Sequence, residues 1–254
     1  MIPWEHLDTA RVPGTAKDAL RLMRRGTEFA IFAGATPLMN SRMSSSEIVL
    51  ADVACERLKG RRDVRMLIGG YGMGFTLRAA LAALGRDALV TVAELVPQVL
   101  DWARGPMAEL TAGCLDDKRV RVHVGDVGEA IAAPRGGYDA ILLDVDNGPD
   151  GLSRAANDRL YDPRGLEMAR RALRPGGMLA VWSAAPSAAF VARLGRAGFA
   201  VEEVKARANK GRGVRHVIWL ATNPGPRRGA SPPSGRASKA TPNPVPRSPR
   251  TRTA

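Results

Sequence analysis

From residue 64 to about residue 221, short apolar runs alternate with helical stretches, and this alternation restricts the fold more than any other feature of the chain. The apolar runs span residues 64–68, 89–93, 120–124, 140–143, 178–182 and 217–221. The helical stretches between them span residues 75–84, 97–110, 127–132, 165–173 and 187–197. Strands that alternate with helices predict a mostly parallel sheet with helices on both faces. Because the apolar runs are unbroken, that sheet is expected to be buried on both sides.

The last two predicted strands, residues 199–205 and 214–221, are separated by only eight residues. A parallel connection needs about a dozen residues or more, so these strands are expected to pair antiparallel as a hairpin at one sheet edge. The predicted fold class is α/β, with a mostly parallel seven-stranded sheet, a C-terminal antiparallel hairpin and a short N-terminal extension.

Three zones follow from the composition along the chain. Residues 1–62 form an N-terminal segment, for which we expect a small hairpin around Gly34 and a helix over residues 46–58. Residues 63–223 form the α/β domain. Residues 224–254 carry seven of the basic residues, no acid and eight of the 18 prolines, so they have little to bury and are predicted to be disordered.

The net charge of +13 first suggests nucleic acid, but +7 of it belongs to residues 224–254 and only +6 to the rest of the chain. Nucleic acid would therefore bind only through this basic tail. Two cysteines, Cys55 and Cys114, are too few for a disulfide scaffold. No metal site is expected because no His, Asp and Glu residues have ligand spacing. With no secretory leader and no membrane-spanning run, we expect a cytoplasmic protein and no membrane partner.

A glycine-rich loop follows the first strand of the alternation and opens its first helix. Its glycines are Gly69, Gly70, Gly72 and Gly74, and Glu94 ends the next predicted strand. Glycines let the backbone turn sharply and let a ligand approach it. An acid at this spacing can accept hydrogen bonds from both hydroxyls of a ribose. The loop fits neither the dinucleotide fingerprint nor a P-loop, which favours a ligand with a ribose and no phosphate.

Two further acids follow the next strands: Asp126 after the third and Asp144 after the fourth. The carboxyl ends of parallel strands meet at one edge of the sheet, where ligands bind. A carboxylate on the third strand can accept from an exocyclic amine, and one on the fourth faces the reacting end. Each acid can also be a loop residue or a helix cap, and Asp126 precedes a predicted helix.

These motifs together resemble the class I S-adenosylmethionine-dependent methyltransferase fold, which is Rossmann-like, and in particular the spermidine synthase family. The resemblance covers about residues 64–183 and is carried by residues 67–74, Glu94, 119–126, 138–144 and 173–177. It implies S-adenosylmethionine or its decarboxylated form as cofactor, bound at the glycine loop. It also implies that Glu94 holds the ribose, Asp126 the adenine amine, and Asp144 stands near the transferred group. A homodimer is expected only by analogy.

Three functions remain open. The resemblance favours transfer of an aminopropyl group to a small cationic amine or another small acceptor. Asp144 and Asp146 are then the catalytic residues, which attract the amine and accept its proton, although residues 146–149 can also simply form a turn. Polyamine synthases carry a second acid where this chain has Asn147, and an acid in the glycine loop where it has Gly72. An amide cannot take a proton, which favours methyl transfer to another acceptor instead. The third alternative is a cofactor-binding module without catalysis.

Overall fold

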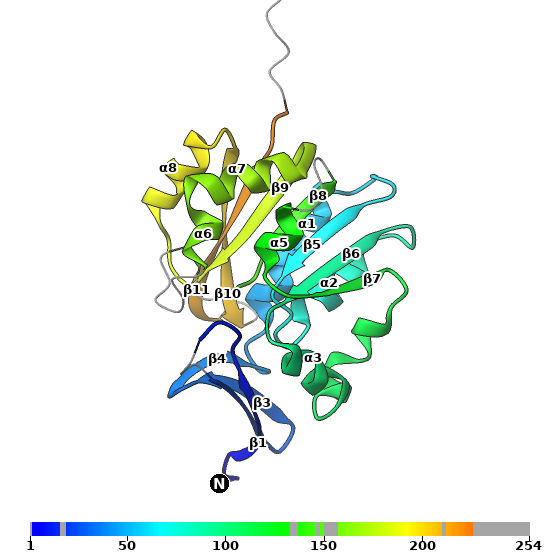
Figure 1. Ribbon diagram of the computed structural model, residues 1–254, viewed down its shortest axis with the longest axis vertical. Coiled ribbons are helices and arrows are strands. Elements are labelled where there is room, and N and C mark those ends of the chain that lie inside the picture. The colour runs from blue at the N-terminus through cyan, green and yellow to red at the C-terminus, as the bar shows by residue number, and fades with distance from the viewer. Residues whose placement is uncertain are drawn as a thin grey trace, which may run out of the picture.

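The computed structural model describes residues 2–15, 19–132, 137–145, 148–149, 157–209 and 212–225 (Figure 1). One group of strands comes from the N-terminal segment: β1 (Glu5–Arg11), β2 (Ala19–Arg25), β3 (Glu28–Ala33) and β4 (Thr36–Asn40). The other group is β5 (Arg65–Gly69), β6 (Leu89–Glu94), β7 (Val120–Val124), β8 (Tyr138–Leu143), β9 (Leu173–Ser183), β10 (Ala200–Asn209) and β11 (Arg212–Thr222).

Helices connect most of these strands. They are α1 (Ser45–Arg57), α2 (Phe75–Ala83), α3 (Pro97–Arg104), α4 (Ala108–Thr111), α5 (Val127–Ala132), α6 (Asp158–Tyr161), α7 (Pro163–Ala172) and α8 (Ala188–Arg196), with a short 3-10 turn at Cys114–Asp116. The predicted helix over residues 97–110 is two helices, α3 and α4, because the chain leaves helical geometry at Gly105 (φ −104°, ψ −108°). Within the described residues, no helix is long and apolar enough to cross a membrane.

The large sheet has seven strands in the order β10-β11-β9-β8-β5-β6-β7. Strands β7, β6, β5, β8 and β9 pair in parallel, whereas β11 pairs antiparallel with both β9 and β10. The prediction of a mostly parallel sheet with an antiparallel hairpin at one edge is confirmed. Strand β5 lies between β6 and β8, so the chain order reverses there, and ligands bind at such a switch point in open α/β sheets.

Helices cover both faces of the large sheet, which explains the unbroken apolar strands. On one face, Met66 and Ile68 of β5 pack in a core with α1, α2 and α3. On the other face, Leu67 of the same strand packs in a core with α5, α7 and α8. Successive side chains of a strand point to opposite faces, so both sets must be apolar.

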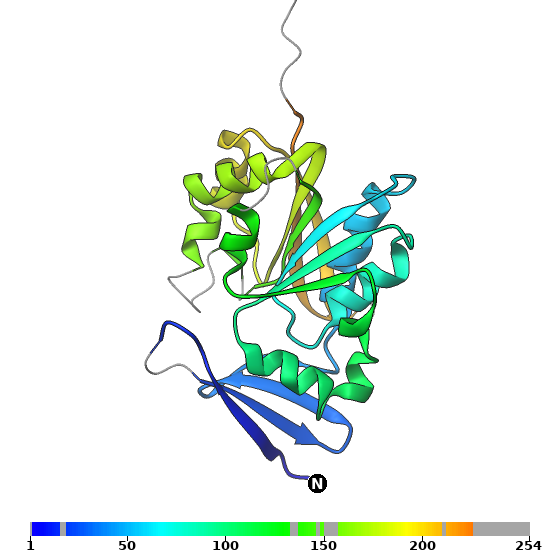
Figure 2. The ribbon, with the colours of Figure 1, turned by 45° about the vertical axis from the view of Figure 1, so that its right-hand side comes forward.

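The N-terminal segment is richer in structure than expected. The hairpin around Gly34 is present as β3 and β4, but β1 and β2 extend it to a four-stranded antiparallel sheet. This small sheet lies beneath one end of the large sheet as a separate layer (Figures 1 and 2). The expected helix over residues 46–58 is α1, which packs against α2 and the large sheet. The division at residue 62 stays a prediction, and all but Pro224 and Gly225 of the predicted disordered tail lies outside the described residues.

Candidate active site

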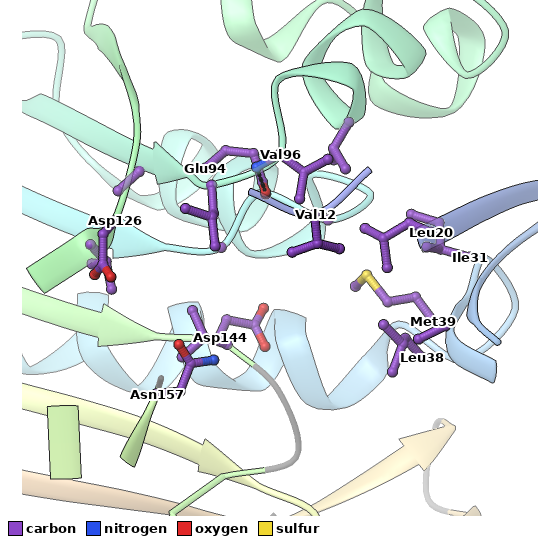
Figure 3. Close-up of a pocket in the computed structure, with 18 of the residues that line it drawn as sticks. Val12, Leu20, Ile31, Leu38, Met39, Glu94, Val96, Asp126, Asp144 and Asn157 are labelled. Atoms are coloured by element: carbon purple, nitrogen blue, oxygen red, sulfur yellow. Dashed lines mark hydrogen bonds between the residues drawn. The ribbon is translucent and has the colours of Figure 1, made fainter. Parts of the chain in front are cut away.

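A cavity of about 520 Å³ opens at the carboxyl ends of β5, β6 and β8, between the large sheet and the small sheet (Figure 3). Its volume is in the range of about 300–1,000 Å³ that is usual for small-molecule sites. Glu94, Asp126 and Asp144 all line it, and Figure 3 shows them at the same end. The strand-end acids singled out from the sequence therefore do come together.

The glycine loop brings its backbone to the cavity at Gly70 and Gly72. Gly70 has a φ of +86°, and a Cβ there would overlap the backbone carbonyl oxygen of Asp144. Glycine is therefore required for β5 and β8 to end side by side. Gly69 and Gly74 are not among the cavity-lining residues. A Cβ on Gly69 would stand 2.8 Å from Cγ2 of Val127, so Gly69 allows α5 to pack on the sheet.

Glu94 is the last residue of β6 and only 8% exposed. Its two carboxylate oxygens each accept a backbone N–H at 2.9 Å, one from Tyr71 and one from Val96. Burial raises the pKa of Glu94, and these backbone donors oppose that rise. The backbone N–H groups of Gly72 and Leu95 act on Glu94 in the same direction, so the loop and the chain after β6 hold this carboxylate in place at the cavity.

Asp126 lies between β7 and α5 and is partly buried. Its Oδ1 accepts the backbone N–H of Gly128 at 2.7 Å, so the residue does orient the first turn of the helix. Its Oδ2 lies 3.9 Å from the guanidinium of Arg159. Asp126 therefore caps helix α5 and also lines the cavity. The two predictions for this residue, a helix cap and a ligand-binding acid, are compatible.

Asp144 directly follows β8 and interacts with a second acid, Glu47 of α1, which also lines the cavity. The hydroxyl of Thr76 donates to Oδ2 of Asp144 at 2.6 Å. Burial, and then the charge of Glu47, raise the pKa of Asp144 to about 7. Burial also raises the pKa of Glu47, although the hydroxyl of Ser46 donates to its Oε2 at 2.7 Å. A proton is therefore held on this pair near neutral pH.

Two features of the site were missed from the sequence. Glu47 is in the first turn of α1, where acids are common because they favour the helix dipole, so its type gave no specific signal. The second feature is the apolar part of the cavity, which the small sheet supplies. The predicted catalytic residue Asp146, and Asn147 beside it, lie outside the described residues.

Comparisons with known proteins show which families the chain resembles. A family model described as S-adenosyl-L-methionine-dependent methyltransferase matches residues 93–217. The polyamine aminopropyltransferase of Mycobacterium tuberculosis is 35% identical over 130 residues, which are 50% of this chain and 24% of that protein. Spermine synthase of Arabidopsis thaliana is 33% identical over 115 residues, 45% of this chain and 30% of that protein. The alignments thus span about a quarter to a third of these relatives' lengths.

Solved structures resemble the whole fold. Spermidine synthase from Thermotoga maritima has a TM-score of 0.67 at 15% identity, covering 86% of this chain and 72% of that one. A spermidine synthase in complex with a transition-state analogue has a TM-score of 0.66 at 14% identity, with the same coverage. Fold and cavity thus define a protein with the class I S-adenosylmethionine-dependent methyltransferase fold. Within this class, the relatives by sequence are a polyamine aminopropyltransferase and a spermine synthase. The chain's resemblance to the spermidine synthase-like family is therefore confirmed.

Proposed function

We propose that the protein is a spermidine synthase-like transferase that moves an aminopropyl group from decarboxylated S-adenosylmethionine to a small cationic amine. The observation that carries the proposal is the gathering of Glu94, Asp126 and Asp144 around one cavity at the switch point of the sheet. The curated relatives named polyamine aminopropyltransferase support the same reaction. The residues proposed to bind the cofactor all belong to the predicted domain over residues 63–223, which we propose is the cofactor-binding domain.

The residues of the cavity fit the proposed cofactor. The carboxylate oxygens of Glu94 are acceptors that suit the two ribose hydroxyls, and Oδ2 of Asp126 is an acceptor that suits the adenine amine. Gly70 and Gly72 line the cavity with their backbone, which the nucleoside could approach. When bound, the cofactor supplies a carbon that is activated by a positively charged sulfur; the acceptor nitrogen forms a bond to this carbon, and the electron pair of the broken C–S bond stays on sulfur.

The acidic pair Glu47 and Asp144 suits the acceptor. An amine arrives protonated at neutral pH and must lose one proton before its nitrogen can attack. The negative pair would bind the ammonium, and Asp144 would accept this proton because its pKa of about 7 lies near the working pH. Asp146 remains our proposed second acid. Binding of nucleic acid through residues 224–254 and formation of a homodimer remain predictions.

Methyl transfer from S-adenosylmethionine is a second candidate, and one observation in the loop favours it. The Sδ atom of Met39 lies 2.5 Å from the place where a Cβ on Gly72 would stand. A thioether thus fills the space beside the loop position at which polyamine synthases carry an acid. Asn147 likewise replaces an acid, so the chain lacks two of the carboxylates that aminopropyl transfer uses in the family it resembles.

Calorimetry with the two cofactors, followed by mass spectrometry of the products formed with amines, tests the proposal. We expect tighter binding of the decarboxylated cofactor and the appearance of methylthioadenosine with an aminopropylated amine. Preference for S-adenosylmethionine, with S-adenosylhomocysteine as product, would replace aminopropyl by methyl transfer. Binding without any product would leave a cofactor-binding module.

A further inference from the structure

The cavity has two chemically different halves. Its acids, Glu47, Glu94, Asp126 and Asp144, come from the carboxyl edge of the large sheet and from α1. The opposite half is formed mainly by the small sheet and its connections, and Figure 3 shows its apolar side chains gathered away from the acids. We call this set the apolar wall; it consists of Val12, Leu20, Ile31, Leu38 and Met39.

The acids of the cavity all lie in one of the two halves. Among the described residues that the small sheet and its loops contribute to the cavity, there is no acid and one cation, Arg21. The guanidinium of Arg21 donates to the carbonyl oxygen of Gly34 at 2.6 Å and lies 5.9 Å from the ring centre of Phe32. The electrostatic potential in the half of the cavity formed by the small sheet is therefore neutral to positive, which disfavours a bound cation there.

The apolar wall adjoins the acidic pair. Met39 reaches the glycine loop at Gly72, and Gly70 of that loop packs on the backbone of Asp144. A ligand with its amino group at the acidic pair would therefore extend toward Met39 and the rest of the wall. A second ammonium group there would lose water and find no carboxylate among the described lining residues, whereas a hydrocarbon group would gain from burial.

We propose that the acceptor is a primary amine whose remaining part is apolar, with its amino group at Glu47 and Asp144 and its hydrocarbon part on the apolar wall. The small sheet then selects against diamines. This inference rests on the proposed function, because it takes the amine to be the acceptor of the transferred group. The preference for one amine over another is a difference in affinity, which can be measured without turnover.

The test compares pentylamine with putrescine, which differ mainly in having a methyl or an ammonium group at the far end. Calorimetry on the full chain saturated with methylthioadenosine gives the dissociation constant of each amine. We expect pentylamine to bind about tenfold more tightly or better. Equal binding, tighter binding of putrescine, or no binding of either amine at millimolar concentration would overturn the inference.

Substitution at the wall provides a second test. In Leu20→Glu the new carboxylate should raise the affinity for putrescine about tenfold relative to pentylamine. Leu20→Gln is the matched control, because it adds polarity without charge and should weaken pentylamine without favouring putrescine. An unchanged ratio of affinities in a folded Leu20→Glu variant would also contradict the inference. Absence of any transfer product, with pentylamine still preferred in binding, would instead count against the proposed function alone.

Discussion

Replacing Glu47 by glutamine removes one of two interacting carboxylates and should stabilise the protein above neutral pH. The pKa of Asp144 rises from 3.8 to about 7, so the folded protein holds this proton more tightly than the unfolded chain. Stability therefore falls as pH rises from about 4 to about 7 and stays reduced above that range. About three pH units correspond to roughly 4 kcal/mol of unfolding free energy. Burial is the larger cause and Glu47 the second, so Glu47 contributes only part of this loss, on the order of 1–2 kcal/mol.

Urea unfolding at about pH 5 and about pH 8.5 measures this effect. Glu47→Gln should be more stable than the parent chain by about 1–2 kcal/mol at the higher pH and nearly equal to it at the lower pH, where protonation already relieves the repulsion. Glu56→Gln, on the same helix but exposed, should show no such difference. A Glu47→Gln variant that is less stable at the higher pH, or shifted equally at both, would refute the coupling of the two acids.

Three further predictions concern single substitutions. Glu94→Gln should weaken cofactor binding roughly ten- to a hundredfold in calorimetry, because it removes a charged acceptor; unchanged affinity would mean that Glu94 does not hold the ribose. Phe190→Ala should lower the unfolding free energy by about 3–5 kcal/mol in urea, since Phe190 is fully buried between Tyr161 and Trp219 at 5.7 and 5.0 Å between ring centres; a loss below about 1 kcal/mol would show a looser core. Asp139→Asn should cost about 1–3 kcal/mol, because this buried carboxylate accepts from two partly exposed guanidinium groups and one backbone amide; equal stability would show that these contacts contribute little.

The large sheet could be predicted because its inner strands β5, β8 and β9 are largely buried on both faces and stand out as apolar runs, whereas the edge strand β7 alternates and is partly exposed. The eight residues between the last two strands excluded a crossover helix, which predicted the edge hairpin correctly. Strands β1 and β2 were missed for the opposite reason: most of their residues are exposed or half-exposed, and their sequences EHLDTAR and ALRLMRR carry no long apolar run. The break between α3 and α4 was missed because the apolar spacing continues across Gly105.

The acids at the strand ends could be placed together from the sequence, because the topology of a parallel sheet brings its carboxyl ends to one edge. Glu47 and the apolar wall could not, since Glu47 reaches the cavity only when α1 packs on the large sheet, and the wall only when the small sheet lies beneath it. Local patterns carry no information about such packing between distant segments. The individual roles of Glu94, Asp126 and Asp144 remain predictions, as does that of Asp146.

A crystal structure of the protein with methylthioadenosine tests the central claim most directly, namely that the cavity between the two sheets binds the nucleoside of an S-adenosylmethionine-type cofactor. The account predicts both ribose hydroxyls at about 2.5–3.2 Å from the carboxylate oxygens of Glu94 and the adenine amine at a similar distance from Asp126. A nucleoside bound outside this cavity, or one inside it that contacts neither acid, would contradict the account.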